Sequence, residues 1–366
     1  MCVAHSTIAC FAQLNVSCQR YIRLARLDIW VICTLYDPLM LSSLHKALYH
    51  SIHPKPRQTM QAPSDSSSSV LTGITFMITS LFTLSVLDGT GKWLMAIGLP
   101  LLVLCWIRYS VHSLLVLVII LPKNGVRALH TAKPITQILR GTIMLASTLC
   151  FFTTLRYLPQ AEATAINFIA PLIVLAIAPY LLKEKTQLAR WIAAIIGFMG
   201  ILLIIRPSAG LNMTGVFFGL FNAVLFSIQF IVTRRLASEN PMTTLVWSGL
   251  CGTLMLCVYT LFNFEHVMNA LGQLTTVQWL LLISTGISGG LGHLLQIQAY
   301  RYAPASMLAP FTYMQIISAT ALGWIVWRQF PDMLTWVGIA IICASGVGIA
   351  LKELHQQGRI VKPRSD

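Results

Sequence analysis

The sequence predicts an all-α integral membrane protein with about ten transmembrane helices. Of its 366 residues, 56% are hydrophobic and only 10% are charged, whereas a soluble domain is about a quarter charged. The apolar residues form long unbroken runs without the alternation of a transmembrane β-barrel, so the backbone polar groups must be satisfied within helices.

A hydrocarbon layer about 30 Å thick requires roughly 20 apolar residues of helix. Ten runs of about this length follow one another, mostly with short connections. We expect spans at 70–88, 100–121, 136–155, 161–182, 188–205, 214–233, 243–262, 277–299, 305–327 and 334–351. The first span contains no carboxylate from Val70 to Leu87, and we expect none deep inside any span.

Residues 1–69 are expected to form a cytoplasmic leader. An apolar stretch within it is interrupted by Asp37 and Pro38, which argues against a span, and a polar segment opens at Met60. We therefore expect residues 1–59 to be dispensable. The alternative is an interfacial helix that carries Arg20, Arg23 and Arg26.

The net charge is +14, and the positions of the basic residues are explained by membrane topology. Lys and Arg are scattered between apolar runs and form no basic patch with interleaved aromatics, so no nucleic-acid partner is expected. If the N-terminus is cytoplasmic, only Lys92, Arg156, Arg206 and Arg328 lie on the opposite side. The positive-inside rule thus predicts that both termini, including the basic tail 352–366, are cytoplasmic.

An internal repeat divides the chain into halves, 70–205 and 214–351. A shift of 145 residues superimposes Arg156-Tyr-x-Pro159 on Arg301-Tyr-x-Pro304, and also pairs Gly141 with Gly286 and Trp191 with Trp336. Because each half has five predicted spans, an odd number, the halves must cross the membrane in opposite senses. Inverted repeats of this kind place a substrate site near the midplane, between the halves.

The chain resembles the ten-helix EamA-type branch of the drug/metabolite transporter superfamily. The first half matches through Arg156-Tyr-Leu-Pro-Gln-Ala-Glu, Leu181-Leu-Lys-Glu-Lys185 and Gly197, and the second through Ala299-Tyr-Arg-Tyr-Ala-Pro-Ala-Ser306 onward to Trp324. Family members carry an acidic residue at the end of the fourth helix of each repeat, whereas this chain has Glu184 in the first half and Gln329 in the second.

The resemblance implies a secondary transporter in a bacterial inner membrane that moves a small organic solute by alternating access. Amino-acid derivatives and S-adenosylmethionine-like or flavin-like compounds are the cargo classes that it suggests. Membrane lipid and the solute are the expected partners, and the protein would be a monomer or a homodimer.

Polar residues inside a span are candidates for the transport site. Arg108 lies within the second span and is suited to an anionic group of the cargo, although it could instead reach the membrane interface. Pro171 cannot donate a hydrogen bond to the carbonyl of Asn167, so a kink is expected there. The predicted substrate-binding residues are Arg108, Asn167, Pro171, Asn222, Gln296, Tyr313 and Gln315; for each, a packing role is the alternative.

Proton coupling would need a titratable group near the spans. Glu162 opens the kinked fourth span, His112 lies one turn after Arg108, and His293 lies in the eighth span. A carboxylate in a first helical turn is also favoured by the helix dipole alone, so Glu162 could be structural.

Motifs for enzyme chemistry are absent from the sequence. It contains no Walker loop, HExxH or Gly-x-Ser-x-Gly, and its nine cysteines show no metal-ligand spacing. We expect no catalytic residue, metal or cofactor. The competing hypothesis is an integral membrane enzyme acting on a lipid substrate.

Overall fold

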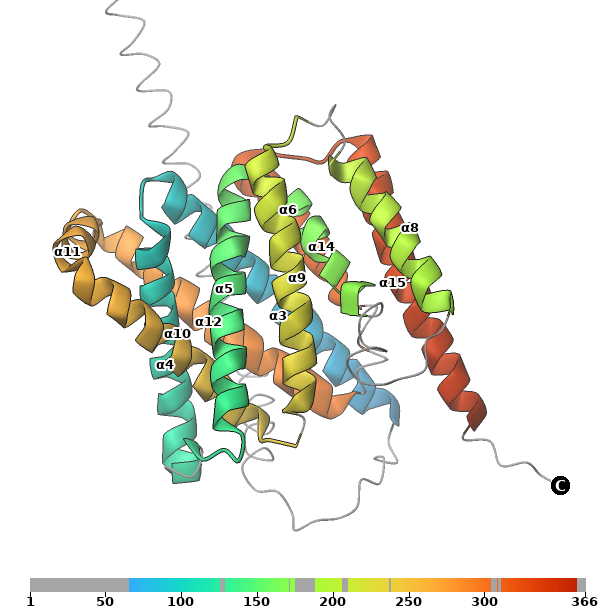
Figure 1. Cartoon of the computed structure of the whole chain (residues 1–366), viewed down its shortest axis with the longest axis horizontal. Coiled ribbons are helices and arrows are strands. Elements are labelled where there is room, and N and C mark those ends of the chain that lie inside the picture. The colour runs from blue at the N-terminus through green and yellow to red at the C-terminus, as the bar shows by residue number, and fades with distance from the viewer. Residues whose placement is uncertain are drawn as a thin grey trace, which may run out of the picture.

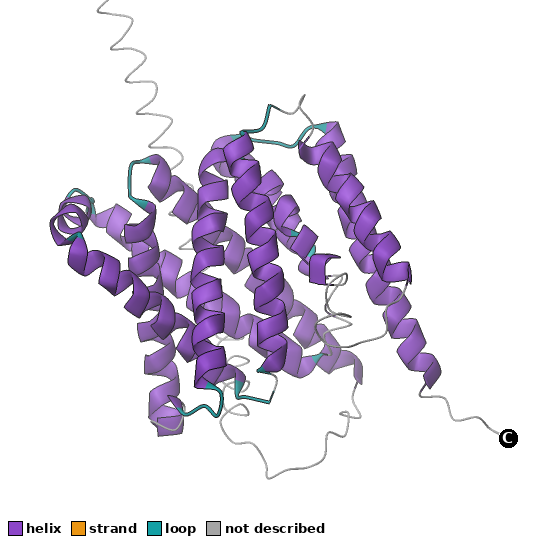
Figure 2. Ribbon diagram, viewed as in Figure 1, coloured by secondary structure: helices purple, strands orange, loops and turns teal. Residues whose placement is uncertain are grey.

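The computed structural model describes residues 66–125, 129–170, 172–174, 188–205, 210–236, 238–303, 308 and 311–360. Within these residues, all regular structure is helical (Figure 2). Several predictions fall outside the described residues, namely the leader 1–59, Pro171, Glu184 and Pro304.

Eleven helices are described, and most coincide with the predicted spans. They are α3 (Ser66–Ala96), α4 (Leu101–Asn124), α5 (Pro134–Tyr157), α6 (Gln160–Asn167), α8 (Leu188–Ile205), α9 (Met213–Arg235), α10 (Pro241–Phe262), α11 (Phe264–Gly272), α12 (Thr276–Tyr302), α14 (Met314–Trp327) and α15 (Met333–Ile360). Six of them are long and apolar enough to cross a membrane: α3, α4, α5, α9, α10 and α12.

Shorter apolar helices occupy the places of the other four predicted spans. The described chain is thus that of an all-α, multi-pass membrane protein.

Local sequence accounts for several helix starts. Pro134 and Pro241 stand in the first turns of α5 and α10, where a missing N–H costs nothing. Asn240 caps α10 through its side chain, and Thr275 forms a capping box with Gln278 at the start of α12.

Two predictions about element boundaries are wrong. α3 does not stop at residue 88 but continues to Ala96, through Asp88 and Lys92. Glycines next to charged residues resemble a loop in sequence, yet transmembrane helices tolerate glycine and their polar side chains find partners on neighbouring helices. The segment after α10, expected to be a simple loop, contains the short helix α11.

The helices associate in pairs that are distant in sequence. α3 packs along α12, α5 along α9, α4 against α10, and α8 against α15. Figure 1 shows α5 and α9 side by side at the centre, with α8 and α15 as a separate pair at one edge. α12 also contacts α4, α10 contacts α5, α14 contacts α3 and α6, and α6 contacts α9.

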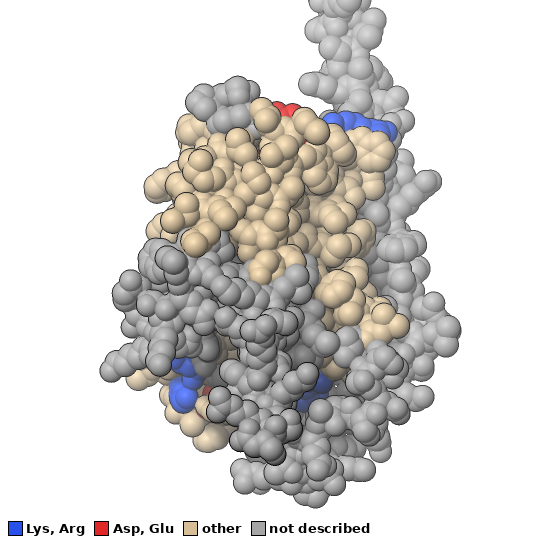
Figure 3. Space-filling model, turned by 90° about the vertical axis from the view of Figure 1, so that its right-hand side faces the viewer, with Lys and Arg blue, Asp and Glu red and all other residues tan. Residues whose placement is uncertain are grey.

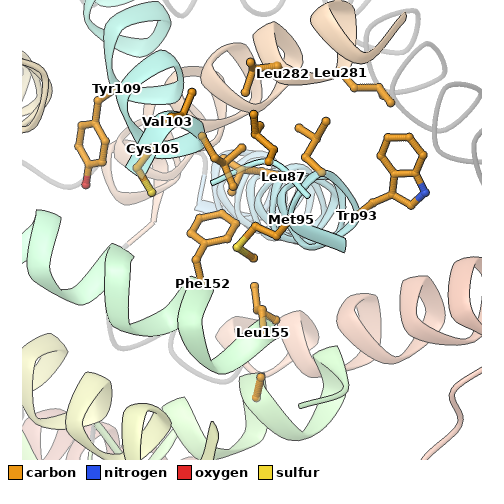
Figure 4. Packing of buried hydrophobic residues seen from close by; sticks show 14 of the residues in the cluster. Leu87, Trp93, Met95, Val103, Cys105, Tyr109, Phe152, Leu155, Leu281 and Leu282 are labelled. Atoms are coloured by element: carbon orange, nitrogen blue, oxygen red, sulfur yellow. The ribbon is translucent and has the colours of Figure 1, made fainter. Parts of the chain in front are cut away.

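The largest buried cluster lies where α3, α4 and α5 meet. Phe152 of α5 is 1% exposed and points toward Leu87 and Met95 of α3, close to Cys105 of α4 (Figure 4). Close-packed aromatic and aliphatic side chains here fix the relative positions of three helices that carry charged groups.

The outer surface is apolar where lipid would meet it. α8 exposes Ile195 and Met199 by more than half of their surface. Figure 3 shows this side of the molecule, where the described surface below the charged residues at the top is broad and uncharged. Such a large exposed apolar face is expected of a membrane protein and not of a soluble monomer.

Candidate functional site

A guanidinium and two imidazole side chains from two helices, α4 and α12, meet inside the bundle. Arg108 and His112 lie one turn apart on α4, and the rings of His112 and His293 of α12 meet edge to face with their centroids 6.1 Å apart. Arg108 lies within electrostatic range of both histidines. The structure therefore brings together three of the residues that the sequence singled out.

Aromatic faces position the Arg108 guanidinium. Its central carbon lies 5.3 Å from the ring centroid of Phe152 and 5.6 Å from that of Tyr109. A cation near two aromatic rings gains a cation–π attraction to each ring. Tyr109 is fixed in turn by a 2.9 Å hydrogen bond between its hydroxyl group and that of Thr148 on α5.

Asp88 is the residue that the sequence analysis missed. It lies within α3, is only 7% exposed, and has Arg108 as its opposite charge. The expectation that no carboxylate lies deep in a span is therefore wrong, because it depended on ending the first span too early.

Polar side chains also link α5, α6 and α9. Asn222 of α9 donates a 2.8 Å hydrogen bond from Nδ2 to Oδ1 of Asn167, and its Oδ1 accepts a 2.6 Å bond from the hydroxyl group of Ser147. Asn222 is 1% exposed. Satisfied buried amides of this kind fix the register of helices in an apolar medium.

The fourth predicted span is interrupted where a kink was expected. α6 ends at Asn167, and Phe168 has turn geometry before helical residues resume. Phe168 lies against Tyr313, with their ring centroids 5.0 Å apart, and Tyr313 precedes α14 directly. Asn167, Asn222 and Tyr313 are thus gathered around the interruption.

A second charged group joins α3, α5, α6 and α14. Lys92 of α3 donates a 2.7 Å hydrogen bond to the carbonyl of Leu158 and lies 5.2 Å from the ring of Trp327. Glu162 of α6 is within electrostatic range of Lys92. Gln160, at the start of α6, donates a 2.8 Å bond to the carbonyl of Ser85 on α3.

Several buried polar atoms in α6 lack hydrogen bonds to the described part of the chain. They are Oε1 of Gln160, Oε2 of Glu162 and Oγ1 of Thr164. Unsatisfied buried polar atoms are costly and therefore cluster at sites with a function. Glu162 itself is 8% exposed and so is well shielded from solvent.

The remaining predicted residues have fewer contacts with the group formed by Arg108, His112 and His293. Gln296 interacts with His293 one turn away on α12. Gln315 accepts a bond through its backbone carbonyl from Ser318. Arg140, counted in sequence as a residue of the cytoplasmic end, bonds Thr233 and Ser248 and so joins α5 to α9 and α10.

The arrangement offers a positive group beside a carboxylate and two imidazoles, with amide and phenol groups on the facing helices. In an apolar bundle, such residues are suited to binding a polar solute and not to holding the fold alone. The sequence profile of the EamA-like transporter family matches the chain twice, over residues 71–206 and 213–351. The chain belongs to the EamA-like transporter family.

Relatives of this EamA-like protein are named as transporters of small molecules. It is 22% identical to the S-adenosylmethionine uptake transporter of Rickettsia prowazekii over 79% of this chain and 96% of the relative. It is 23% identical to the pseudopaline exporter of Pseudomonas aeruginosa over 76% and 95% of the two chains. It is 30% identical to an uncharacterized transporter of Helicobacter pylori over 59% and 72%.

A solved crystal structure shares the fold of this EamA-like protein. The TM-score is 0.53 at 17% sequence identity, and the match covers 81% of this chain and 99% of the other. Together with the family and the six membrane-spanning helices, these similarities identify a small-molecule transporter of the bacterial inner membrane.

Proposed function

We propose that the protein is a secondary transporter that moves a small organic metabolite by alternating access, with both termini in the cytoplasm. The observation that carries this proposal is the position of Arg108, which lies inside the bundle beside Asp88 and between helices of the two family-matched segments. A cation held there can pair with an anionic group of a solute that has left water.

The two family-matched segments form inverted repeats of five spans in this proposal, 70–205 and 214–351. Helix packing supports the symmetry. If α9, α10, α12, α14 and α15 are the equivalents of α3, α4, α5, α6 and α8, the packing of α3 on α12 corresponds to that of α9 on α5. The contacts of α12 with α4 and of α3 with α14 correspond likewise to those of α5 with α10 and of α9 with α6.

Individual contacts agree with the same correspondence. A Cβ on Gly73 of α3 would lie 2.8 Å from Ala303, and a Cβ on Gly215 of α9 would lie 2.8 Å from Leu158. Leu158 and Ala303 are paired by the 145-residue shift, as are Gly141 and Gly286, each of which lets its helix approach a neighbour closely.

The cargo is expected to contact two sets of interior residues, one at Arg108 and one at the interruption after α6. Arg108 would pair with its anionic group, while Asn167, Asn222 and Tyr313 would bind its uncharged polar parts near the interrupted helix. Pro171, Gln296 and Gln315 complete the proposed substrate-binding set, and Glu162, His112 and His293 are the proposed coupling groups. Four relatives are named S-adenosylmethionine uptake transporters, which favours an S-adenosylmethionine-like cargo, and other amino-acid derivatives and flavin-like compounds are the other candidates.

Reconstitution tests the proposal. Purified protein in liposomes should take up or release one member of a panel of amino-acid derivatives, S-adenosylmethionine and flavins, and Arg108→Met should raise the KM for it by about tenfold or more, as for the loss of a charge-assisted contact. Phe221→Ala, on the exposed face of α9, is the matched control. If no anionic or zwitterionic solute moves, the assigned role of Arg108 is wrong.

A further inference from the structure

Asp88 and Arg108 lie close enough to attract each other, yet they do not form an ion pair. Asp88 of α3 is within electrostatic range of Arg108 of α4. Within the described residues, neither the carboxylate group nor the guanidinium group takes part in a hydrogen bond or an ion pair. Opposite charges inside a membrane protein usually pair with one another. This open pair therefore keeps its hydrogen-bonding capacity for another molecule.

Aromatic rings, and no hydrogen-bond acceptor, hold the Arg108 guanidinium group in place. One of these rings is that of Phe152, 5.3 Å from the guanidinium carbon. The same ring is wedged against Gly91, one turn after Asp88 on α3, so closely that a Cβ on Gly91 would collide with it. Phe152 thus lies against both the helix that carries Asp88 and the guanidinium group of Arg108.

No other cation of the described chain takes the place of Arg108 beside Asp88. Lys92 lies one turn further along α3, but its ammonium group bonds the carbonyl of Leu158 and lies over the ring of Trp327. Among the described residues, Arg108 is the charged group that acts on Asp88. The Asp88 carboxylate is thus available to an ammonium group of a bound solute.

The second family-matched segment adds a backbone surface next to Arg108. A Cβ on Gly289 of α12 would lie 3.7 Å from Nε of Arg108 and 3.1 Å from Leu87, the neighbour of Asp88. Residues of α3 and α4 therefore meet over a glycine of α12. A longer side chain at this position would reach the guanidinium group, whereas glycine leaves it accessible to a solute between the two halves of the chain.

We infer that Asp88 and Arg108 together bind the zwitterionic head of an α-amino acid, with its ammonium group at Asp88 and its carboxylate group at Arg108. A guanidinium group matches a carboxylate through two parallel hydrogen bonds, and an ammonium group donates to a carboxylate. The cargo is therefore an amino acid, or a derivative that keeps both groups free. This inference rests on the proposed transport function and gives Asp88 a role in binding.

A zwitterion neutralises both charges of the open pair, whereas a solute with a single charge does not. An anion without an ammonium group would leave Asp88 unneutralised and would bring a second negative charge near it. A cation without a carboxylate group would meet the same penalty at Arg108. Because an unpaired charge inside a membrane is costly, the pair selects against both kinds of solute. Flavins, which lack this head group, should not bind.

Analogues that lack one charge test the head-group site in the unaltered full chain. The first set of probes is S-adenosylmethionine, its decarboxylated form, and its 2-oxo analogue, in which a carbonyl group replaces the α-amino group. The second set is L-methionine, its methyl ester and its N-acetyl derivative. Binding is measured as the rise of the thermal unfolding midpoint in detergent, and transport as uptake into liposomes.

We expect both charges of the head group to be required. Each modified probe should bind at least about tenfold more weakly than its parent, as for the loss of one charge-assisted hydrogen bond. The inference is overturned if a modified probe or riboflavin binds as well as the parent compounds, or if neither parent binds. This comparison uses the unaltered protein and so does not depend on the folding of any variant.

Substitutions assign each charge to its residue. Asp88→Asn should weaken the binding of S-adenosylmethionine about tenfold without weakening that of the 2-oxo analogue, so that the preference for the ammonium group disappears. Arg108→Met should likewise abolish the preference over the decarboxylated form. Asp88→Glu keeps the charge and should retain a preference for the parent. Glu265→Gln, which removes an exposed carboxylate on α11, should behave like the unaltered protein.

An equal loss for all probes in Asp88→Asn would show that Asp88 supports the fold alone, against the inference. Binding and transport also fail independently. If the parents bind and the analogues do not, but no solute crosses the membrane, the head-group site stands and the proposed function fails. If a solute without a free α-amino or α-carboxylate group is transported, the proposed function stands and the head-group site fails.

Discussion

Asn222 donates a 2.8 Å hydrogen bond to Asn167, the last residue of α6, and so ties the interruption of the fourth span to α9. The same amide accepts a bond from Ser147 of α5. One side chain therefore connects three helices at the point where the chain departs from helical geometry.

Asn222→Ala should destabilise the protein by about 1 kcal/mol, because it leaves two buried partners without their bonds while hydrogen bonds between membrane helices are individually modest. The measurement is the thermal unfolding midpoint in detergent, which we expect to fall by a few degrees. Val224→Ala, two residues away on the exposed face of the same helix, should change the midpoint little. Equal effects of the two substitutions would contradict the assigned role.

The Asp88–Arg108 pair predicts a non-additive pair of substitutions. Arg108→Met alone removes a positive charge that acts on the buried carboxylate of Asp88 and should lower the free energy of unfolding. Adding Asp88→Asn removes that uncompensated charge and should recover at least half of the loss. The free energy of unfolding of both single variants and of the double variant checks this, and strict additivity would show that the two residues do not interact.

Glu162→Gln tests proton coupling, because it keeps the size and hydrogen bonding of the side chain but cannot titrate. If Glu162 carries the proton, proton-driven accumulation of cargo should collapse while exchange of cargo across the membrane survives. Accumulation is measured in liposomes with an imposed pH gradient. Full pH-dependent accumulation in the variant would leave Glu162 as a helix-terminus residue and transfer the role to His112, His293 or Asp88.

The topology predicts the side on which reporters appear. Fusions near residues 128, 187, 237 and 358 should report from the cytoplasm, and fusions near 98, 209 and 273 from outside. The position near 98 lies in the turn between α3 and α4. Position 273 is the most informative, because a cytoplasmic signal there would contradict ten spans.

The lengths of the apolar runs and the polar residues between them predicted most of the helices. The runs that became α4, α5, α9 and α10 were found to within a few residues because lipid exposure requires unbroken apolar sequence. The predicted first span ended too early because α3 carries Asp88 and Lys92, which look like loop residues in the sequence. Their partners, Arg108 and Leu158, lie outside α3. A buried charge is recognisable only when its partner is known.

The site was predicted residue by residue but not as an arrangement. Arg108, His112 and His293 were chosen for being polar within apolar runs, and packing of α4 on α12 brings them together. Asn167 was chosen for a kink at Pro171, which lies outside the described residues, and α6 ends at Asn167. Phe152, whose ring faces both Gly91 and Arg108, gave no signal, because an aromatic residue in a membrane helix is usually only packing.

The lengths of α3 and α12 connect this protein to the membrane around it. Their apolar segments, of 26 and 27 residues, span about 40 Å at 1.5 Å per residue, more than the roughly 30 Å of hydrocarbon in a typical bilayer. Such an excess is accommodated by tilt, by a kink or by local thickening of the bilayer, and Figure 1 shows both helices inclined relative to α5 and α9. The acyl-chain length of the surrounding lipid therefore bears on how this pair of helices sits in the bilayer.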